Sequence, residues 1–116
     1  MKGRGFLFRA ACALQGMRAA FRSESSFRTQ VAAAVLAACA TLLIRPPLVW
    51  AALVAAMIAL VLAAELFNTA LEHVLDALHP GDAEFVRIAK DCAAAAVLVL
   101  SILSVAVFCM MLAAVY

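Results

Sequence analysis

Charged residues are scarce in this sequence, and their scarcity limits the class of protein. Aspartate, glutamate, lysine and arginine make up 14% of the 116 residues, whereas 69% of the residues are hydrophobic. Soluble domains contain about 25% charged and about 45–50% apolar residues. The composition therefore excludes an ordinary soluble domain. It predicts an all-α membrane protein, one domain over residues 1–116, with a few crossings of about 20 residues each.

Metal-binding cysteine pairs are absent as well. Cys12, Cys39, Cys92 and Cys109 are far apart, without CxxC spacing, and we interpret them as small buried hydrophobic residues without a redox or metal role. The formal net charge of +2 is too small to indicate nucleic-acid binding. We therefore expect no nucleic-acid partner.

Apolar runs predict three spanning helices, over residues 27–44, 48–78 and 92–115. The sequence "RPP" at 45–47 should end the first, because proline lacks an N–H donor and restricts the residue before it. "HPGD" at 79–82 should end the second, and we expect a polar connection from there to Asp91.

Residues 5–22 predict an amphipathic helix that lies in the membrane interface. Phe6, Met17 and Phe21 recur at helical spacing among three arginines that could reach lipid phosphates. A cleaved signal peptide is the alternative. We expect the helix to be retained, because the apolar run starts too late and no small-residue cleavage site follows.

Basic residues divide unequally between the two sides of a three-span chain. Arg45 lies alone on one side, and eight basic residues lie on the other, which places the N-terminus and the 79–91 connection in the cytoplasm. The eight are Lys2, Arg4, Arg9, Arg18, Arg22, Arg28, Arg87 and Lys90.

A polar stripe follows the uncharged part of the second span. On a helix, Glu65, Asn68, Glu72 and Asp76 fall within an arc of about 80°. Glu24 precedes the first span and should lie near the same interface, where these acids would repel one another without a cation or proton. Carboxylates of this kind suit Mg²⁺, which usually arrives with substrate phosphates.

Depth in the membrane suggests different roles for the carboxylates. Glu65 lies about 10 Å deeper along the helix than Glu72, so it could accept a proton from a lipid hydroxyl, while Glu24 and Glu72 hold the metal. Lys90 could neutralise phosphoryl oxygens, and Asp91 could accept a hydrogen bond from an adenine amine or a ribose hydroxyl.

Each of these residues also has a structural interpretation. Glu72 and Asp76 could be the solvated end of a helix, and Asn68 could join helices. Lys90 and Asp91 could be a topological anchor and a helix N-cap. His73 lies off the centre of the stripe and is interpreted as an interfacial surface residue.

The sequence resembles the prokaryotic diacylglycerol kinase family, small trimeric lipid kinases of the membrane. The resemblance is carried by "ELFNTALEHVLD", by "AKD" after it and by "FRSESSFR" before it, with consistent spacing from about Gly5 to Leu100. It implies transfer of the γ-phosphoryl group of MgATP to a lipid hydroxyl at the bacterial inner membrane. It also implies a homotrimer with active sites shared between subunits.

The resemblance also implies roles for single residues. Glu65 matches the general base, Asn68 an active-site asparagine, and Glu24 and Glu72 the metal-bridging carboxylates. Lys90 and Asp91 match the nucleotide-contacting pair.

Three segments depart from the family pattern. Gly81, Asp82 and Ala83 replace a polar E-Y-H segment near the nucleotide, where Asp82 or Glu84 could compensate. Ala13 replaces a serine near the phosphates. Ala93 and Ala94 follow "AKD", where they could change the fit of the lipid headgroup.

Diacylglycerol is the expected acceptor, and undecaprenol is the alternative. The "GFLF" start and the compact "RPP" connection resemble the undecaprenol kinases of the same family. Two other classes remain open at this point. A small transporter or proton channel would use Glu65 without ATP, and a structural subunit would be insensitive to Glu65→Gln.

Overall fold

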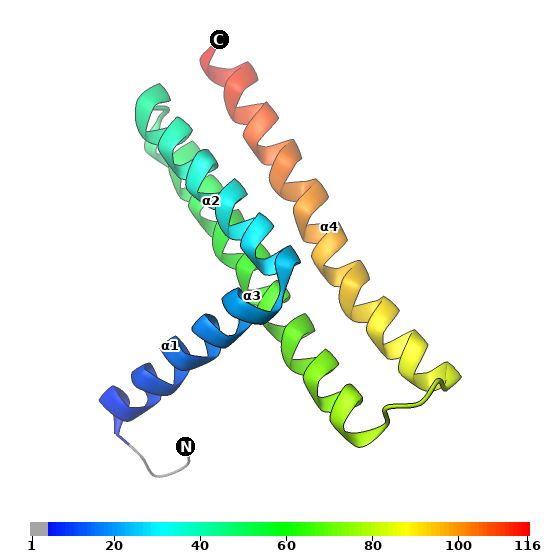
Figure 1. Cartoon of the computed structure of the whole chain (residues 1–116). Coiled ribbons are helices and arrows are strands. Elements are labelled where there is room, and N and C mark those ends of the chain that lie inside the picture. Colours follow the sequence, from blue (N-terminus) through cyan, green and yellow to red (C-terminus); the bar gives the residue numbers. More distant parts are fainter. Residues whose placement is uncertain (1–4) are drawn as a thin grey trace.

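The computed structural model describes residues 5–116, which fold into four helices with no strand among them. The helices are α1 (Phe6–Ser23), α2 (Ser25–Ile44), α3 (Leu48–Leu78) and α4 (Glu84–Val115). In Figure 1, α2 and α4 run along α3, and α1 leaves the bundle at a steep angle. The all-helical expectation is confirmed for the residues that the structure describes.

Three of the helices, α2, α3 and α4, are long and apolar enough to cross a membrane. The expected polar connection up to Asp91 is wrong, because α4 already begins at Glu84. Two ion pairs extend the helix into this charged segment: Arg87 contacts Glu84 at 3.7 Å and Asp91 at 3.2 Å. These spacings of three and four residues place the side chains on one face of a helix.

A left-handed residue forms the turn between α2 and α3. Arg45 has φ 54° and ψ 56°, and its backbone N–H donates to the carbonyl of Thr41. This geometry satisfies an otherwise open carbonyl at the helix end, and Pro46 and Pro47 then prevent the helix from continuing. The predicted break at "RPP" is confirmed.

A single residue separates α1 from α2. Glu24 is the C-cap of α1 and the N-cap of α2, and we call this junction the elbow. The Arg28 guanidinium donates to the carbonyls of Phe21, at 2.7 Å, and of Arg22, at 3.1 Å. A cation on the last carbonyls of a helix is favourable, so Arg28 fixes the angle at which α1 leaves α2.

The protein core is thin and follows one face of α3. Its buried side chains recur every three or four residues: Val54, Met57, Val61, Glu65 and Thr69. Glu65 therefore occupies a core position of the helix, where Val61 precedes it by one turn. The face that buries the apolar residues of α3 also carries the deepest carboxylate of the chain.

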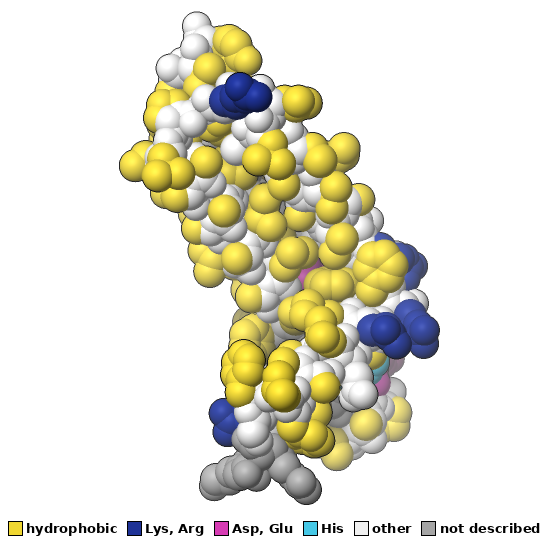
Figure 2. All heavy atoms as spheres, turned by 90° about the vertical axis from the view of Figure 1, so that its left-hand side faces the viewer, with side chains coloured by type: hydrophobic (Ala, Val, Ile, Leu, Met, Phe, Trp, Pro, Cys, Tyr) yellow, Lys and Arg dark blue, Asp and Glu magenta, His cyan; other side chains and the backbone are white. Residues whose placement is uncertain are grey.

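Large hydrophobic side chains cover much of the outer surface, as membrane-spanning helices require (Figure 2). The cysteines share this exposure, so their interpretation as buried residues is wrong for the single chain. Cys39, Cys92 and Cys109 are exposed, and Cys12 is half-buried. A helix surface that faces lipid carries the same residue types as a protein core, because both environments are apolar.

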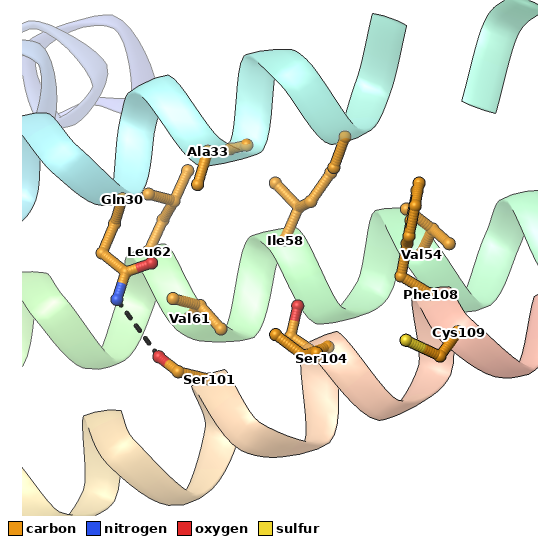
Figure 3. Close-up of a pocket in the computed structure, with 13 residues that line it drawn as sticks. Gln30, Ala33, Val54, Ile58, Val61, Leu62, Ser101, Ser104, Phe108 and Cys109 are labelled. Atoms are coloured by element: carbon orange, nitrogen blue, oxygen red, sulfur yellow. Dashed lines mark hydrogen bonds between the residues drawn. The ribbon is translucent and has the colours of Figure 1, made fainter. Parts of the chain in front are cut away.

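A cleft of about 240 Å³ lies between α2 and α4, with α3 as its floor (Figure 3). At one end of the cleft, Gln30 Nε2 donates to Ser101 Oγ at 3.1 Å, which joins α2 to α4. Most of the other lining residues are apolar, among them Ala33, Ile58 and Phe108. One polar contact thus ties two helices that otherwise both pack on α3.

Candidate active site

Glu65 lies at the point where α2 meets α3, just beneath the elbow. Only 3% of its surface is exposed. Ser26 Oγ, in the first turn of α2, donates to Glu65 Oε2 at 3.2 Å. The sequence predicted an acidic group deep in an apolar helix. The structure adds a hydroxyl group, on Ser26, that donates a hydrogen bond to this carboxylate.

Asn68 and Glu72 form the middle of the polar stripe. Asn68 Nδ2 donates to Glu72 Oε1 at 3.3 Å, over one helical turn. Asn68 Oδ1 and Thr69 Oγ1 are fully buried and have no hydrogen-bond partner among the described residues. A buried oxygen without a donor is costly. This part of α3 therefore has polar oxygens that could still accept a hydrogen bond or contact a cation.

Lys90 and Asp76 connect the end of the stripe to α4. Lys90 Nζ lies 2.7 Å from Asp76 Oδ1, and both side chains are exposed to solvent in part. Asp91, the neighbour of Lys90, pairs with Arg87 of its own helix. The structure therefore brings Lys90 to the carboxylate stripe and turns Asp91 toward the start of α4.

A hollow of about 630 Å³, which we call the loop hollow, lies between the end of α3 and the start of α4. Small-molecule sites commonly have volumes of about 300–1,000 Å³. His79 Nδ1 lies 3.2 Å from the carbonyl oxygen of Gly81, and the His79 ring packs edge-on against Phe85. The charged and titratable residues that line the hollow are Asp76, His79, Asp82, Glu84, Arg87, Lys90 and Asp91.

A second groove runs between α1 and α3. It is lined by small residues of α1, including Ala13, Gly16 and Ala20, and by Thr69 and His73 of α3. His73 is exposed, as expected for an interfacial residue. Ala13, where the family pattern has a serine, faces the same groove as this histidine.

The expected metal ligands do not form a preassembled cluster within residues 5–116. No group of three or more histidine, cysteine, aspartate or glutamate side chains is placed to hold a metal ion there. Glu24 lies at the elbow, half-buried, and Glu72 lies two turns beyond Glu65 on α3. Mg²⁺ needs only one or two carboxylates when phosphates supply further oxygens. Glu72 and Asn68 carry oxygens of the kind that Mg²⁺ prefers, although the Asn68 amide turns its Nδ2 rather than its Oδ1 toward Glu72.

Two contacts of the site were not predicted from the sequence. The sequence pattern assigns no role to Ser26 within "FRSESSFR", and it does not identify Asp76 as the partner of Lys90. Both contacts join residues of different helices. Such contacts depend on how the packed helices are rotated relative to one another. The periodicity of a single helix does not indicate this rotation.

Comparison with known proteins identifies the family of the chain. Residues 11–112 match the family model "Prokaryotic diacylglycerol kinase". A diacylglycerol kinase of Synechocystis sp. is 40% identical over 94 residues, which are 79% of this chain and 53% of that protein. A diacylglycerol kinase of Escherichia coli K12 is 32% identical over 98 residues, which are 84% of this chain and 80% of that protein.

The chain thus spans about half of one relative and four fifths of the other. The family and these relatives support a diacylglycerol kinase function, and a kinase family implies the use of ATP. The chain belongs to the prokaryotic diacylglycerol kinase family.

Proposed function

We propose that the chain transfers the γ-phosphoryl group of ATP to the hydroxyl of diacylglycerol and forms phosphatidic acid. The observation that carries this proposal is the buried Glu65 carboxylate, which lies where α2 meets α3 and accepts a hydrogen bond from Ser26. A lipid hydroxyl at this depth has few other groups to which it could give its proton. Glu65 is accordingly the general base, and Asn68 lies beside it as the second residue at the reacting centre.

The transfer is a direct in-line displacement. The lipid O–H bond breaks as its proton passes to Glu65, and the lipid oxygen forms a bond to the γ-phosphorus atom. The bond from that phosphorus atom to the bridging oxygen of ADP breaks, and its electron pair stays with ADP. No covalent intermediate with the enzyme is required.

The triphosphate binds toward the loop hollow, where Lys90 and Asp91 lie. Lys90 neutralises phosphoryl oxygens and exchanges its contact with Asp76 for one with the nucleotide. Asp91 accepts a hydrogen bond from the nucleoside. Asp82 and Glu84 line the same hollow and compensate for the missing E-Y-H segment.

Glu24 at the elbow and Glu72 on α3 would hold Mg²⁺, and Asn68 Oδ1, one turn before Glu72, would be a further oxygen ligand. Support comes from the absence of a donor for Asn68 Oδ1, since a cation would relieve that cost. When bound, the metal ion would offset negative charge on the phosphates.

A homotrimer supplies the remaining ligands in this proposal. Within residues 5–116 of one chain, no three acidic, histidine or cysteine side chains are placed to hold a metal ion. A site shared between subunits would complete the set. We propose that the trimer lies in the bacterial inner membrane.

The N-terminus and the site face the cytoplasm in this proposal. The helix ends near the site carry Arg22, Arg28, Arg87 and Lys90, whereas Arg45 lies at the opposite turn. Figure 2 likewise shows a single basic group near one end of the bundle and the other basic groups toward the other end. This distribution follows the positive-inside rule.

The test is a competition between acceptors. Purified chain in detergent micelles receives labelled ATP, Mg²⁺ and either dioctanoylglycerol or undecaprenol. We expect labelled phosphatidic acid to form from dioctanoylglycerol faster than labelled lipid forms from undecaprenol. A higher rate with undecaprenol would show that undecaprenol is the acceptor and that the chain is still a lipid kinase. Absence of labelled lipid in both samples would contradict the proposed function.

A further inference from the structure

We propose that Ser26 is a positioning residue for Glu65, whose carboxylate it holds in place and aims at the lipid hydroxyl. The inference rests on the proposed function, because it assigns Ser26 a role only through the base. Ser26 itself touches neither lipid nor nucleotide in this assignment.

The two oxygens of Glu65 have different surroundings. Oε2 accepts the hydrogen bond from Ser26 Oγ, a residue 39 positions earlier in the chain and on another helix. Oε1 accepts no hydrogen bond from residues 5–116. It is also not one of the fully buried unpartnered oxygens of this part of the chain, which belong to Asn68 and Thr69. One oxygen is therefore held in place, and the other keeps its lone pairs free of any hydrogen bond from these residues.

A carboxylate in this position needs a donor because it is buried. Glu65 continues the buried face formed by Val54, Met57 and Val61, and burial of a polar group is costly unless it is hydrogen-bonded. Thr69, one turn further along, makes no hydrogen bond through its buried hydroxyl and does not substitute for Ser26. A hydrogen bond to an ionised group is about twice as strong as one between neutral groups.

The proposed role keeps protons balanced. The lipid hydroxyl gives its proton to Oε1 of Glu65, and Ser26 retains its own proton and its bond to Oε2. Ser26 fixes the direction of the open oxygen, which matters because a small displacement of a reacting group lowers the rate steeply.

The test replaces Ser26 with alanine in the full-length chain. Phosphoryl transfer from labelled ATP to dioctanoylglycerol is measured in mixed micelles. For Ser26→Ala we expect kcat to fall about tenfold, while KM for ATP and KM for dioctanoylglycerol stay within twofold of the parent. Ser26→Thr retains the hydroxyl and should recover at least half of the parent kcat.

Ser25→Ala is the matched control. Ser25 precedes Ser26 in the same first turn of α2, and both serines are exposed. The backbone carbonyl of Ser25, which the substitution keeps, accepts from Thr29 Oγ1, and within residues 5–116 no side-chain hydrogen bond joins Ser25 to Glu65. We expect this variant to behave as the parent chain. A similar kcat loss in Ser25→Ala would assign the effect to the helix end and overturn the inference.

A second comparison uses Glu65→Asp, whose shorter side chain draws the carboxylate away from Ser26. Adding Ser26→Ala to this variant should lower kcat no further, because the hydrogen bond is already lost. A further tenfold fall would show that Ser26 acts independently of Glu65 and would overturn the inference.

Failure of the inference differs from failure of the proposed function. An unchanged kcat in Ser26→Ala, or a lower kcat with weaker substrate binding and a lower melting temperature, overturns the role of Ser26 alone. Absence of lipid phosphorylation by the parent chain overturns the proposed function and this inference with it.

Discussion

The two ends of the polar stripe on α3 differ in exposure and in the kind of contact they make. At the elbow end, Glu65 is buried and accepts a hydrogen bond from a neutral hydroxyl of another helix. At the loop end, Asp76 and Lys90 form an ion pair that stays accessible to solvent. One helix thus carries both a dry carboxylate and a wet charged cluster.

The difference agrees with two separate tasks in lipid phosphorylation. Proton acceptance benefits from a site with little water, where solvent does not compete with the lipid hydroxyl for the carboxylate. Nucleotide capture benefits from exposed charges that a polyphosphate can reach from the cytoplasm. Changes at the elbow end should therefore affect turnover, and changes at the loop end should affect ATP binding.

Removal of the buried carboxylate should have the largest effect. Glu65→Gln keeps the size of the side chain and an oxygen that accepts from Ser26, but it cannot take a proton at neutral pH. We expect kcat for dioctanoylglycerol phosphorylation to fall by about 100- to 10,000-fold. Steady-state transfer of labelled phosphate measures this, and circular dichroism should show unchanged helix content. A loss smaller than fivefold would exclude Glu65 as the base.

Removal of the exposed cation should affect the nucleotide. For Lys90→Ala we expect KM for ATP to rise about tenfold, since a charge-assisted contact with phosphate is lost, while kcat changes less. Arg45→Ala is the control, because Arg45 lies at the opposite turn of the bundle. The assignment of Lys90 would be wrong if both variants had the same KM as the parent.

Ionic strength should separate the two ends without a mutation. Salt screens exposed charges, with a Debye length of about 10 Å at 0.1 M and about 3 Å at 1 M. We expect KM for ATP to rise by about two- to fivefold between these concentrations, with little change in kcat at saturating ATP. If kcat fell in parallel with ATP binding, the elbow end would be exposed to salt and would not be shielded from solvent.

Loosening of the elbow should have the smallest effect. Arg28→Ala removes the guanidinium from the last carbonyls of α1, and we expect a loss of stability of about 1 kcal/mol. Thermal unfolding in detergent measures the change, and kcat should fall less than in Ser26→Ala. A melting temperature equal to that of the parent would show that packing of Ala20 and Phe27 alone holds the elbow.

Hydropathy and helix-breaking residues predicted most of the fold. The span 48–78 coincides with α3, and "RPP" separates it from α2. The start of α4 was misplaced because the charged residues after Ala83 resembled a connection. The spacing of Glu84, Arg87 and Asp91 by three and four positions was a usable sign of helix in that segment.

The site was predictable only within single helices. The periodicity of α3 placed Glu65, Asn68, Glu72 and Asp76 on one face, and Asn68 and Glu72 do hydrogen-bond to each other. Contacts between helices were not accessible in this way. Ser26 reaches Glu65, and Lys90 reaches Asp76, because of how the helices are rotated and packed against one another.

Equilibrium binding of a fluorescent ATP analogue to Glu65→Gln tests the central claim most directly. If α3 separates proton acceptance from nucleotide binding, this variant should bind the analogue with a Kd within twofold of the parent while its lipid phosphorylation is nearly abolished. A Kd more than tenfold weaker would contradict the account, because the buried carboxylate would then belong to the nucleotide site.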